Sequence, residues 1–339
     1  MTKKSQAKAG DVPLTPGKGA HCLRARPDKP GGAGQHAGGF RSSQRANCLQ
    51  AQPGYPKGGS DMVKIVTDSS CDLSLERCAE LGVEMLPITV NFGEESYRAN
   101  VDLTTEDFYD KLAQAKELPH TAQITPAFFE KKFKEYMEAG DQVVCLFISS
   151  QMSGTLQSAT VAKGMLGATN IYLPDTLNVT FALGLLVEEA VKMRDRGLSA
   201  PQIVEEIGQL VPRVRLWALI EDLKYLKMGG RLSASSALVA SILGICPIIT
   251  LKDGLVEVVG KARGRKAAFA AIRKLVEKEP ISSDYCVTVG HANVPENRKA
   301  FEAYMSDLLK NREVHIQDIG SIVGTHTGPG AVGLAYIKK

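Results

Sequence analysis

The sequence predicts an α/β fold in three parts: a disordered basic tail at residues 1–61, an α/β domain with a parallel sheet at 62–212, and an α+β domain at 213–339. Between Met62 and about Pro212, short apolar runs alternate with helical patterns, which is the order expected of a parallel sheet with helices on both faces. Beyond residue 212, hairpin-like pairs of apolar runs mix with helical patterns, which favours an α+β domain.

The tail contains eleven Gly and six Pro, and its only aromatic residues are Phe40 and Tyr55. It cannot bury enough apolar surface to offset the entropy lost on ordering, so we expect it to be disordered and dispensable. It lacks the apolar stretch of a secretory signal, and its glycines and prolines disfavour a helical presequence. Two interpretations stay open: Met62 is the natural first residue, because residues 57–61 could be encoded by a ribosome-binding sequence, or the segment is a flexible tail.

Charge and cysteine content exclude several classes of protein. The tail holds ten basic and three acidic residues, which leaves 31 basic and 34 acidic residues in the body. The body therefore lacks the excess of basic residues that is typical of nucleic-acid-binding proteins. Seven cysteines, an odd number without a Cys-x-x-Cys pair, indicate buried free thiols in a reducing cytoplasm. Because no run of 18 apolar residues occurs, we expect a cytoplasmic protein with at most transient membrane contact.

Capping residues and apolar periodicity place the elements of the first domain. Gly82 ends one helix, Thr105 begins another with a Thr-x-Glu pattern, and Ser199 caps a third ahead of Pro201. We expect strands at 63–67, 83–92, 143–148 and 171–173, and helices at 73–81, 105–115, 126–139, 155–167, 180–196 and 199–210.

The second domain has a clear hairpin signal, since Asp253-Gly254 separates two apolar runs. Strands are expected at 216–220, 247–251, 255–260, 285–291, 314–319 and 332–337, and helices at 265–277 and 295–311. The apolar run 237–243 and the strand at 248–251 could line an apolar tunnel or belong to the ordinary core.

Three polar clusters follow strands of the first domain, where ligands of parallel sheets bind. They lie at 67–70, 149–155 and 175–176. For Asp72 and Thr176 we expect only capping of the next helix. Ser153-Gly154-Thr155 instead combines a hydroxyl, an approachable backbone N–H and the positive end of a helix, which favours an anion site.

Two further motifs carry chemistry. Arg231 follows two glycines, where backbone approaches a ligand closely, so it could clamp a carboxylate or phosphate, although a lone arginine is more often a surface ion pair. His326 is expected in a loop with three glycines, which favours an imidazole presented to a ligand. We expect no metal site, because His120, His291 and His315 form no spaced ligand set.

Six motifs in one order resemble the DegV family. They are Thr-Asp-Ser (67–69), His-Thr-Ala-Gln (120–123), Ser-Ser-x-x-Ser-Gly-Thr (149–155), Asp-Thr (175–176), Leu-x-Tyr-Leu-Lys-x-Gly-Gly-Arg (223–231) and Gly-Thr-His-Thr-Gly-Pro-Gly-Ala (324–331). Each is weak alone, but six in order are specific. The resemblance implies a bacterial two-domain protein that needs no cofactor and buries a fatty acid. Some members present it to a separate fatty-acid kinase, which forms an acyl-phosphate for phospholipid synthesis.

The resemblance also implies roles by position. The carboxylate of the fatty acid would be bound by Thr121, Ser153 and Gly154. The head group, where a phosphoryl group arrives, would be contacted by Arg231 and His326, the histidine acting as a protonation-dependent donor near neutral pH. Possible supporting residues behind these are Asp68, Ser69 and Gln123. The chain departs from the family pattern at Ala122, Ile124 and Cys246, positions that bear on chain-length preference and supporting contacts.

Two alternatives involve catalysis by the chain itself. A serine hydrolase would use Ser153, His326 and Asp68, but the serine lacks a Gly-x-Ser-x-Gly elbow. A single-chain kinase would need a P-loop or a kinase signature set, and the sequence contains neither. We therefore expect a lipid-binding carrier, with catalysis supplied by a partner.

Overall fold

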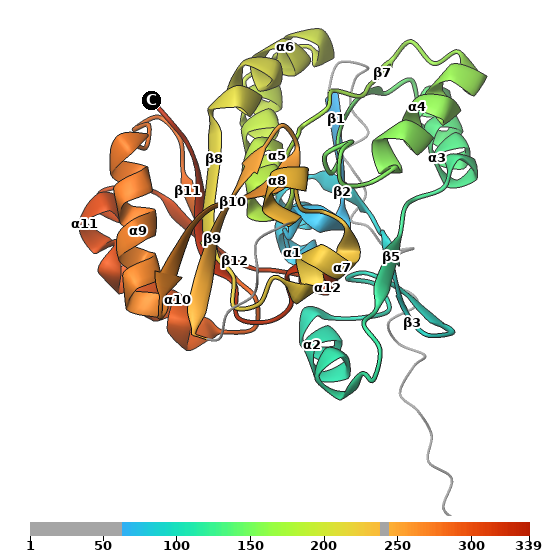
Figure 1. The fold of residues 1–339 in the computed structure, drawn as a ribbon. Coiled ribbons are helices and arrows are strands. Elements are labelled where there is room, and N and C mark those ends of the chain that lie inside the picture. Colours follow the sequence, from blue (N-terminus) through green and yellow to red (C-terminus); the bar gives the residue numbers. More distant parts are fainter. Residues whose placement is uncertain (1–62, 238–243) are drawn as a thin grey trace, which may run out of the picture. The chain divides into compact units, whose positions relative to one another are not determined.

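The computed structural model describes residues 63–237 and 244–339, which form two main β-sheets and a small third sheet (Figure 1). The first main sheet is parallel and the second is mixed, so the predicted fold class is confirmed. The predicted tail lies outside the described residues, and the domain boundary near residue 212 stays a prediction. Among the described residues, no helix is long and apolar enough to cross a bilayer.

The parallel sheet has the strand order β2-β1-β6-β7. Its strands are β1 (Val63–Asp68), β2 (Val83–Leu86), β6 (Gln142–Leu146) and β7 (Ile171–Tyr172). Its helices are η1 (Ser69–Cys71), α1 (Leu75–Leu81), α3 (Pro126–Ala139), α4 (Thr155–Leu166), α5 (Thr180–Asp195) and α6 (Ala200–Leu210). In Figure 1 the sheet lies between α5 and α6 on one side and α3 and α4 on the other, as predicted.

The mixed sheet has the strand order β10-β9-β8-β13-β11-β12, and only β11 and β12 pair in parallel. Its strands are β8 (Val214–Leu219, after the short helix η2, Val211–Arg213), β9 (Ile245–Lys252), β10 (Leu255–Arg263), β11 (Val287–His291), β12 (Val314–Asp318) and β13 (Val332–Ile337). The predicted hairpin is confirmed: β9 and β10 join at Asp253 and Gly254, which both have positive φ.

Both faces of the mixed sheet are covered by helices. The helices α9 (Arg265–Lys278) and α10 (Pro295–Tyr304) pack on one face, where a separate apolar cluster forms around Phe269 and Phe301. Helix α5 contacts strands β8, β11 and β13 and also strands β1 and β6 of the parallel sheet. One helix therefore fills the space between the two main sheets.

The small sheet is the part of the fold that the sequence did not predict. Its strands are β3 (Thr89–Phe92), β4 (Glu95–Arg98) and β5 (His120–Ala122), in the order β4-β3-β5. Helices α2 (Thr105–Gln114) and α12 (Ser321–Thr327) lie beside it, and α12 also contacts α7 (Lys224–Gly229). The short helix α8 (Ala234–Ala237) precedes β9.

Three predicted elements were wrong in detail. The strand expected at 83–92 is two strands in different sheets, because Pro87-Ile88 lies between them and carries the chain from one sheet to the other. The helix expected at 295–311 is divided into α10 and α11 (Ser306–Leu309).

The third error concerns His326, which lies in the last turn of helix α12 and not in a glycine loop. Gly324 is inside this helix, and a Cβ there would lie 2.7 Å from the Phe108 ring and 2.8 Å from the Tyr109 hydroxyl. The glycine therefore allows α12 to pack closely on α2. The helix ends at Gly328, which has a φ of 67°.

Candidate functional site

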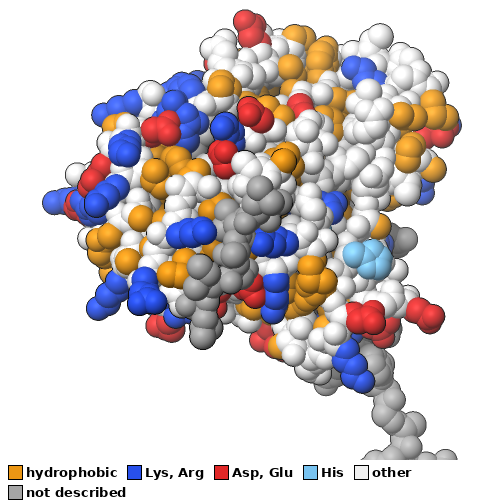
Figure 2. Space-filling view, viewed as in Figure 1, with side chains coloured by type: hydrophobic (Ala, Val, Ile, Leu, Met, Phe, Trp, Pro, Cys, Tyr) orange, Lys and Arg blue, Asp and Glu red, His pale blue; other side chains and the backbone are white. Residues whose placement is uncertain are grey.

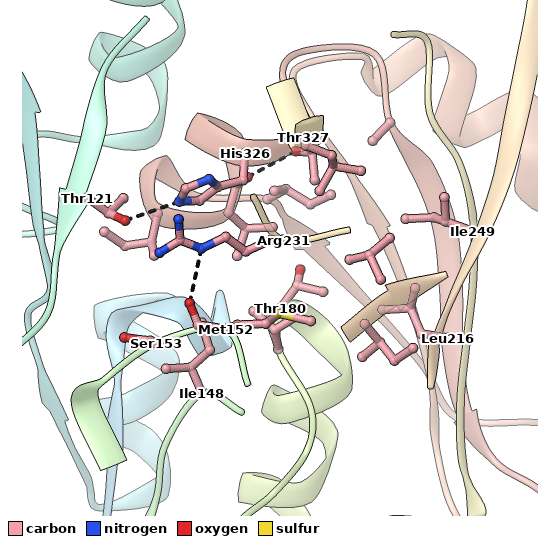
Figure 3. Close-up of a pocket in the computed structure, with 18 of the residues that line it drawn as sticks. Thr121, Ile148, Met152, Ser153, Thr180, Leu216, Arg231, Ile249, His326 and Thr327 are labelled. Atoms are coloured by element: carbon pink, nitrogen blue, oxygen red, sulfur yellow. Dashed lines mark hydrogen bonds between the residues drawn. The ribbon is translucent and has the colours of Figure 1, made fainter. Parts of the chain in front are cut away.

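A pocket lies where helix α12, the small sheet and the two main sheets meet. Most of its lining side chains are apolar, and those that carry polar groups are Thr121, Gln123, Ser153, Thr180, Arg231, His326 and Thr327. Figure 3 shows Thr121, His326, Arg231 and Ser153 on one side of the pocket and Leu216 and Ile249 on the other. The pocket therefore has a polar end and an apolar end.

Thr121 and His326 lie at the polar end of the pocket but are far apart in the sequence. Thr121 lies on β5, and its Oγ1 is 3.1 Å from Nε2 of His326. The other ring nitrogen, Nδ1, is buried and has no hydrogen-bonding partner among the described residues. Such an atom costs free energy unless something in the pocket pairs with it.

The charge state of His326 differs from the sequence-based prediction. Burial, with a smaller effect of the nearby Arg231 cation, lowers the pKa of His326 to about 4. The imidazole is therefore neutral near pH 7 in this structure, and the expectation of a protonation-dependent donor near neutral pH was wrong. The reason is that a buried cation next to another cation is doubly unfavourable.

Arg231 provides a positive charge at the same end of the pocket. Its Nε donates to the carbonyl of Met152 at 3.1 Å, and Nη1 donates to the carbonyl of Gly229. Among the residues that the structure describes, no carboxylate forms an ion pair with it. Arg231 therefore does not form the surface ion pair that is the more common role of a lone arginine. Its guanidinium remains available to an anionic ligand.

Ser153 and Gly154 stand at the beginning of α4. The hydroxyl of Ser153 lies 3.0 Å from the hydroxyl of Thr155 and accepts from the backbone N–H of the same threonine. A Cβ at Gly154 would meet the side-chain amide of Gln123, so a larger residue here would displace that amide. Gln123 itself donates to the hydroxyl of Ser158 at 2.8 Å, which holds β5 against α4.

Asp68 and Ser69 lie behind the pocket wall and do not line the pocket. Asp68 is fully buried and accepts from the hydroxyl of Ser70 and, at 2.8 Å, from the backbone N–H of Ile148. The hydroxyl of Ser69 accepts from the backbone N–H of Ile88 at 2.9 Å. Because both isoleucines line the pocket, these two polar residues fix the position of its wall.

Asp72 is a site residue whose role the sequence did not predict. It was expected to cap a helix, but Ser74 caps α1, and Asp72 instead accepts from the hydroxyl of Thr180 at 2.5 Å and from the N–H of Gly320 at 2.9 Å. Thr180 lines the pocket at the start of α5, and Gly320 directly precedes α12. The carboxyl group therefore joins two walls of the pocket.

The prediction that Thr176 caps the next helix was also wrong. Its hydroxyl donates to the carbonyl of Phe147 at 2.7 Å and so ties the loop after β7 to the end of β6. The neighbouring Asp175 accepts from the hydroxyl of Ser150. Neither residue lines the pocket, so this third polar cluster supports the loop that carries Ser153.

The apolar end is built from strands of the mixed sheet and from the first turn of α5. Ile249 and Leu251 of β9 line it, in agreement with the expected lining strand at 248–251. The other expected lining run, 237–243, lies outside the residues whose side chains the structure describes. Leu216 and Ala218 of β8 and Phe181 of α5 complete this end. The sequence did not identify Leu216, Ala218 and Phe181 as pocket residues, because apolar residues of this kind also form the ordinary core.

The arrangement does not provide the hydrogen bonds of a serine-hydrolase triad. Ser153 pairs with Thr155, the Nε2 of His326 pairs with Thr121, and Asp68 pairs with Ser70 and the backbone of Ile148. A triad requires the base to contact both the nucleophile and the carboxylate.

Comparison with known proteins gives a family match over the described body of the chain. A sequence model of the family described as "Uncharacterised protein, DegV family" matches residues 62–339. A DegV domain-containing protein of Clostridium acetobutylicum is 34% identical over 280 residues, which cover 82% of this chain and 99% of that protein.

Solved structures show the same fold. A stearic acid-binding protein from Eubacterium ventriosum matches with a TM-score of 0.75 and 30% identity, covering 82% of this chain and 99% of its own. DegV of Bacillus subtilis, a fatty acid binding protein, matches with a TM-score of 0.73 and 29% identity over 82% of this chain and 99% of its own.

We predict that Asp72→Asn makes the stability of the protein less dependent on pH. Burial raises the pKa of Asp72 from 3.8 to about 7 in the folded state, so the folded protein binds this proton more tightly than the unfolded chain. The stabilisation is complete below the unfolded pKa and is lost as pH rises through the folded pKa, between about pH 4 and 7.

The free energy of unfolding is measured in urea at about pH 5 and about pH 8, so that most of the pH range in which the stabilisation is lost lies between the two measurements. The wild type should lose more stability between the two than Asp72→Asn does. Asp195→Asn, which changes an exposed carboxylate, is the control and should behave as the wild type. Equal losses in the wild type and Asp72→Asn would contradict the prediction.

Proposed function

The chain belongs to the DegV family, and we propose that it binds one long-chain fatty acid in this pocket and presents it to a separate fatty-acid kinase. The observation that carries the proposal is a single pocket with an apolar end and a polar end, where hydroxyls lie beside an arginine that has no ion-paired carboxylate among the described residues. The fatty-acid-binding proteins of Eubacterium ventriosum and Bacillus subtilis, which share this fold, support the choice of ligand.

The apolar end supplies the driving force in this proposal. Burial of an acyl chain contributes about 0.8 kcal/mol per CH₂ group, or on the order of 12 kcal/mol for a chain of about 16 carbons, before the entropy of association is subtracted. The side chains of Leu216, Ile249 and Phe181 offer no polar group that would need a partner. A long acyl chain is the kind of ligand that such a surface favours.

The polar end fixes the carboxylate. A carboxylate away from water is tolerated only with strong donors around it. The hydroxyls of Thr121 and Ser153 can each donate one hydrogen bond, and the N-terminal end of α4 at Gly154 adds backbone N–H groups and a positive dipole. Gln123 holds β5 against α4 through its bond to Ser158, and Asp68 and Ser69 fix the wall of the pocket beside these donors.

In this proposal, presentation to a kinase rests on a division of roles between the neutral hydroxyls and the charged guanidinium at the polar end of the pocket. The hydroxyls suit a carboxylate with one negative charge, and the forked guanidinium of Arg231 suits a phosphoryl group with more charge. His326 lies beside both and adds a neutral ring nitrogen. In this proposal the protein acts in the bacterial cytoplasm, supplies acyl-phosphate synthesis for phospholipids, and has no nucleic-acid partner.

We predict that the purified protein carries one fatty acid of roughly 14–18 carbons, because burial of this length yields most of the binding energy. Native mass spectrometry should show one lipid per chain, and gas chromatography of an organic extract should identify it. Delipidated protein should take up added palmitate or oleate. A protein without stoichiometric lipid that also fails to bind added fatty acid would exclude the proposal.

We predict that Ser153→Ala and Thr121→Val each weaken fatty-acid binding roughly ten- to a hundredfold, because a hydrogen bond to a charged group contributes about 1.5–3 kcal/mol. Equilibrium binding of a fluorescent fatty acid measures the effect. Thr160→Val and Thr89→Val are the controls, since they remove hydroxyls in α4 and in the adjacent strand β3 from residues that do not line the pocket. Wild-type affinity in both pocket variants would place the carboxylate elsewhere.

We predict that Arg231→Ala and His326→Ala leave fatty-acid binding within a fewfold of the wild type but sharply slow acyl-phosphate formation. The reason is that these residues face the phosphoryl group and the hydroxyls hold the carboxylate. Each variant is measured in two assays: binding of a fluorescent fatty acid, and acyl-phosphate production with added fatty-acid kinase and ATP. Equal losses in both assays would defeat this division of roles, and turnover without any kinase would defeat the carrier function.

A further inference from the structure

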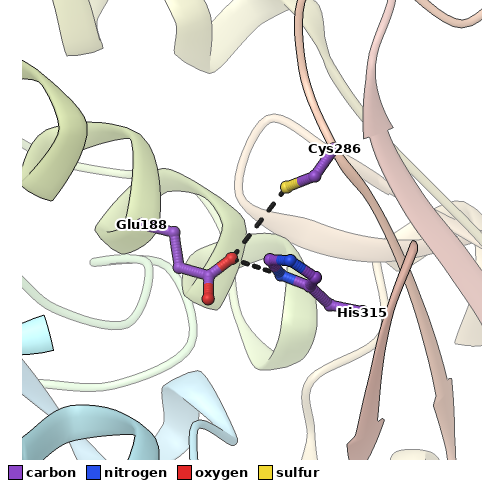
Figure 4. A group of neighbouring side chains, drawn as sticks. All are labelled: Glu188, Cys286 and His315. Carbon is purple, nitrogen blue, oxygen red and sulfur yellow. Dashed lines mark hydrogen bonds and ion pairs between the residues drawn. The ribbon is translucent and has the colours of Figure 1, made fainter. Parts of the chain in front are cut away.

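A second group of chemically competent side chains lies outside the pocket. Glu188 of α5, Cys286 just before β11 and His315 of β12 meet so that one ligand atom of each lies within 4.8 Å of the others (Figure 4). Glu188 and Cys286 are buried, and the His315 side chain is 21% exposed. None of the three lines the pocket.

We propose that Glu188, Cys286 and His315 form a binding site for one Zn²⁺ ion, with water as the fourth ligand. Zinc takes nitrogen, sulfur and oxygen ligands in tetrahedral geometry, with ligand atoms roughly 3–4 Å apart. The Sγ of Cys286 is 3.9 Å from Oε2 of Glu188, and the Nδ1 of His315 is 2.7 Å from the same oxygen. Small rotations of the side chains therefore suffice to admit the ion, and the partial exposure of His315 leaves an approach for water.

The atoms around this group orient the ligands as metal sites require. A ligating histidine usually donates its second ring N–H to a carboxylate, which fixes the other nitrogen toward the metal. Here the Nε2 of His315 is 3.0 Å from Oε1 of Glu313, which leaves Nδ1 for the ion. Arg77 donates from Nε to Oε1 of Glu188 at 2.9 Å, which leaves Oε2 free to bind as well.

The proton balance of the site is simple. In the metal-free state, the protons on Sγ of Cys286 and on Nδ1 of His315 both point to Oε2 of Glu188. Binding of Zn²⁺ releases two protons to solvent, one from Sγ of Cys286 and one from Nδ1 of His315, and the His315 ring keeps the proton on Nε2 that donates to Glu313.

Other charged groups near Cys286 are already paired. Lys192 bonds to Glu189 at 2.8 Å, and its positive charge favours the thiolate of Cys286. The site with Zn²⁺, one thiolate and one carboxylate is electrically neutral, which suits its partly buried position.

This inference departs from the sequence-based expectation that His315 has no metal-binding partners. The expectation relied on short ligand spacings, but Glu188 lies 98 residues from Cys286 and 127 residues from His315. The ligands come from three elements that meet only in the folded chain, so no local motif could mark them. The inference does not depend on the proposed lipid function.

The test is a titration of the chelator-treated full chain with Co²⁺, a spectroscopic substitute for Zn²⁺. One equivalent should produce a thiolate-to-cobalt charge-transfer band and the visible bands of tetrahedral cobalt, and added Zn²⁺ should remove both. Cys286→Ser should abolish the charge-transfer band. His315→Gln should weaken Co²⁺ binding at least tenfold, while Cys246→Ser, a thiol in β9 away from the site, should leave it unchanged.

A second measurement covers the case in which Cys286→Ser does not fold. Zn²⁺ binds only the folded state and should raise the Tm of the wild type by a few degrees, but not that of His315→Gln, which changes a partly exposed side chain. Absence of a thiolate band in the wild type would overturn the proposal. Retention of the band and of the Tm increase in His315→Gln would overturn it equally.

Discussion

The fold depends on the burial of helix α5 between the two main sheets. Of its 16 residues, 13 are buried, including Glu188 and Glu189, so this helix has no solvent face of ordinary size. Its close contacts are possible because of glycines: a Cβ at Gly290 of β11 would collide with the Phe181 ring, and a Cβ at Gly184 would lie 2.7 Å from the carbonyl of Cys71. The first turn of α5 forms part of the pocket, and its middle carries the Glu188 cluster. Both candidate sites therefore depend on the position of one helix.

Most polar groups buried around this helix are paired, which makes the exceptions informative. Asp68, Asp72 and Thr176 each form hydrogen bonds that join segments far apart in the chain. Such networks specify one arrangement of the core, because an unpaired member is costly. Against this background, the unpartnered Nδ1 of His326 and the guanidinium of Arg231, which has no carboxylate among the described residues, stand out at the polar end of the pocket. Nδ1 of His326 is one of six buried side-chain atoms without a partner among the described residues, and of the six residues concerned only His326 lines the pocket.

The sequence predicted the elements whose signals are local. Helices with caps and glycine ends, such as 126–139, and the Asp253-Gly254 hairpin were placed correctly, because propensity, periodicity and turn chemistry agree there. It missed β5 and α12, since three residues of strand carry no periodicity and a helix rich in glycine and threonine resembles a loop. It found the polar residues of the pocket through their motifs but not the role of Asp72, whose partner Gly320 is 248 residues away. Contacts of that range depend on the tertiary fold and leave no local pattern.

Under the proposed function, the geometry of the polar end determines the proton positions around a bound carboxylate. A hydroxyl has one proton to donate and two lone pairs to accept with. If Thr121 donates to the ligand, its contact with Nε2 of His326 requires the ring to donate, so the imidazole proton lies on Nε2 and Nδ1 becomes an acceptor. A neutral ring in this tautomer agrees with the lowered pKa of His326, and it leaves Arg231 as the positive charge at this end of the described pocket. The hydroxyl of Thr121 therefore holds the carboxylate, with its direction set by His326, and the fixed charge of Arg231 remains for the phosphoryl group.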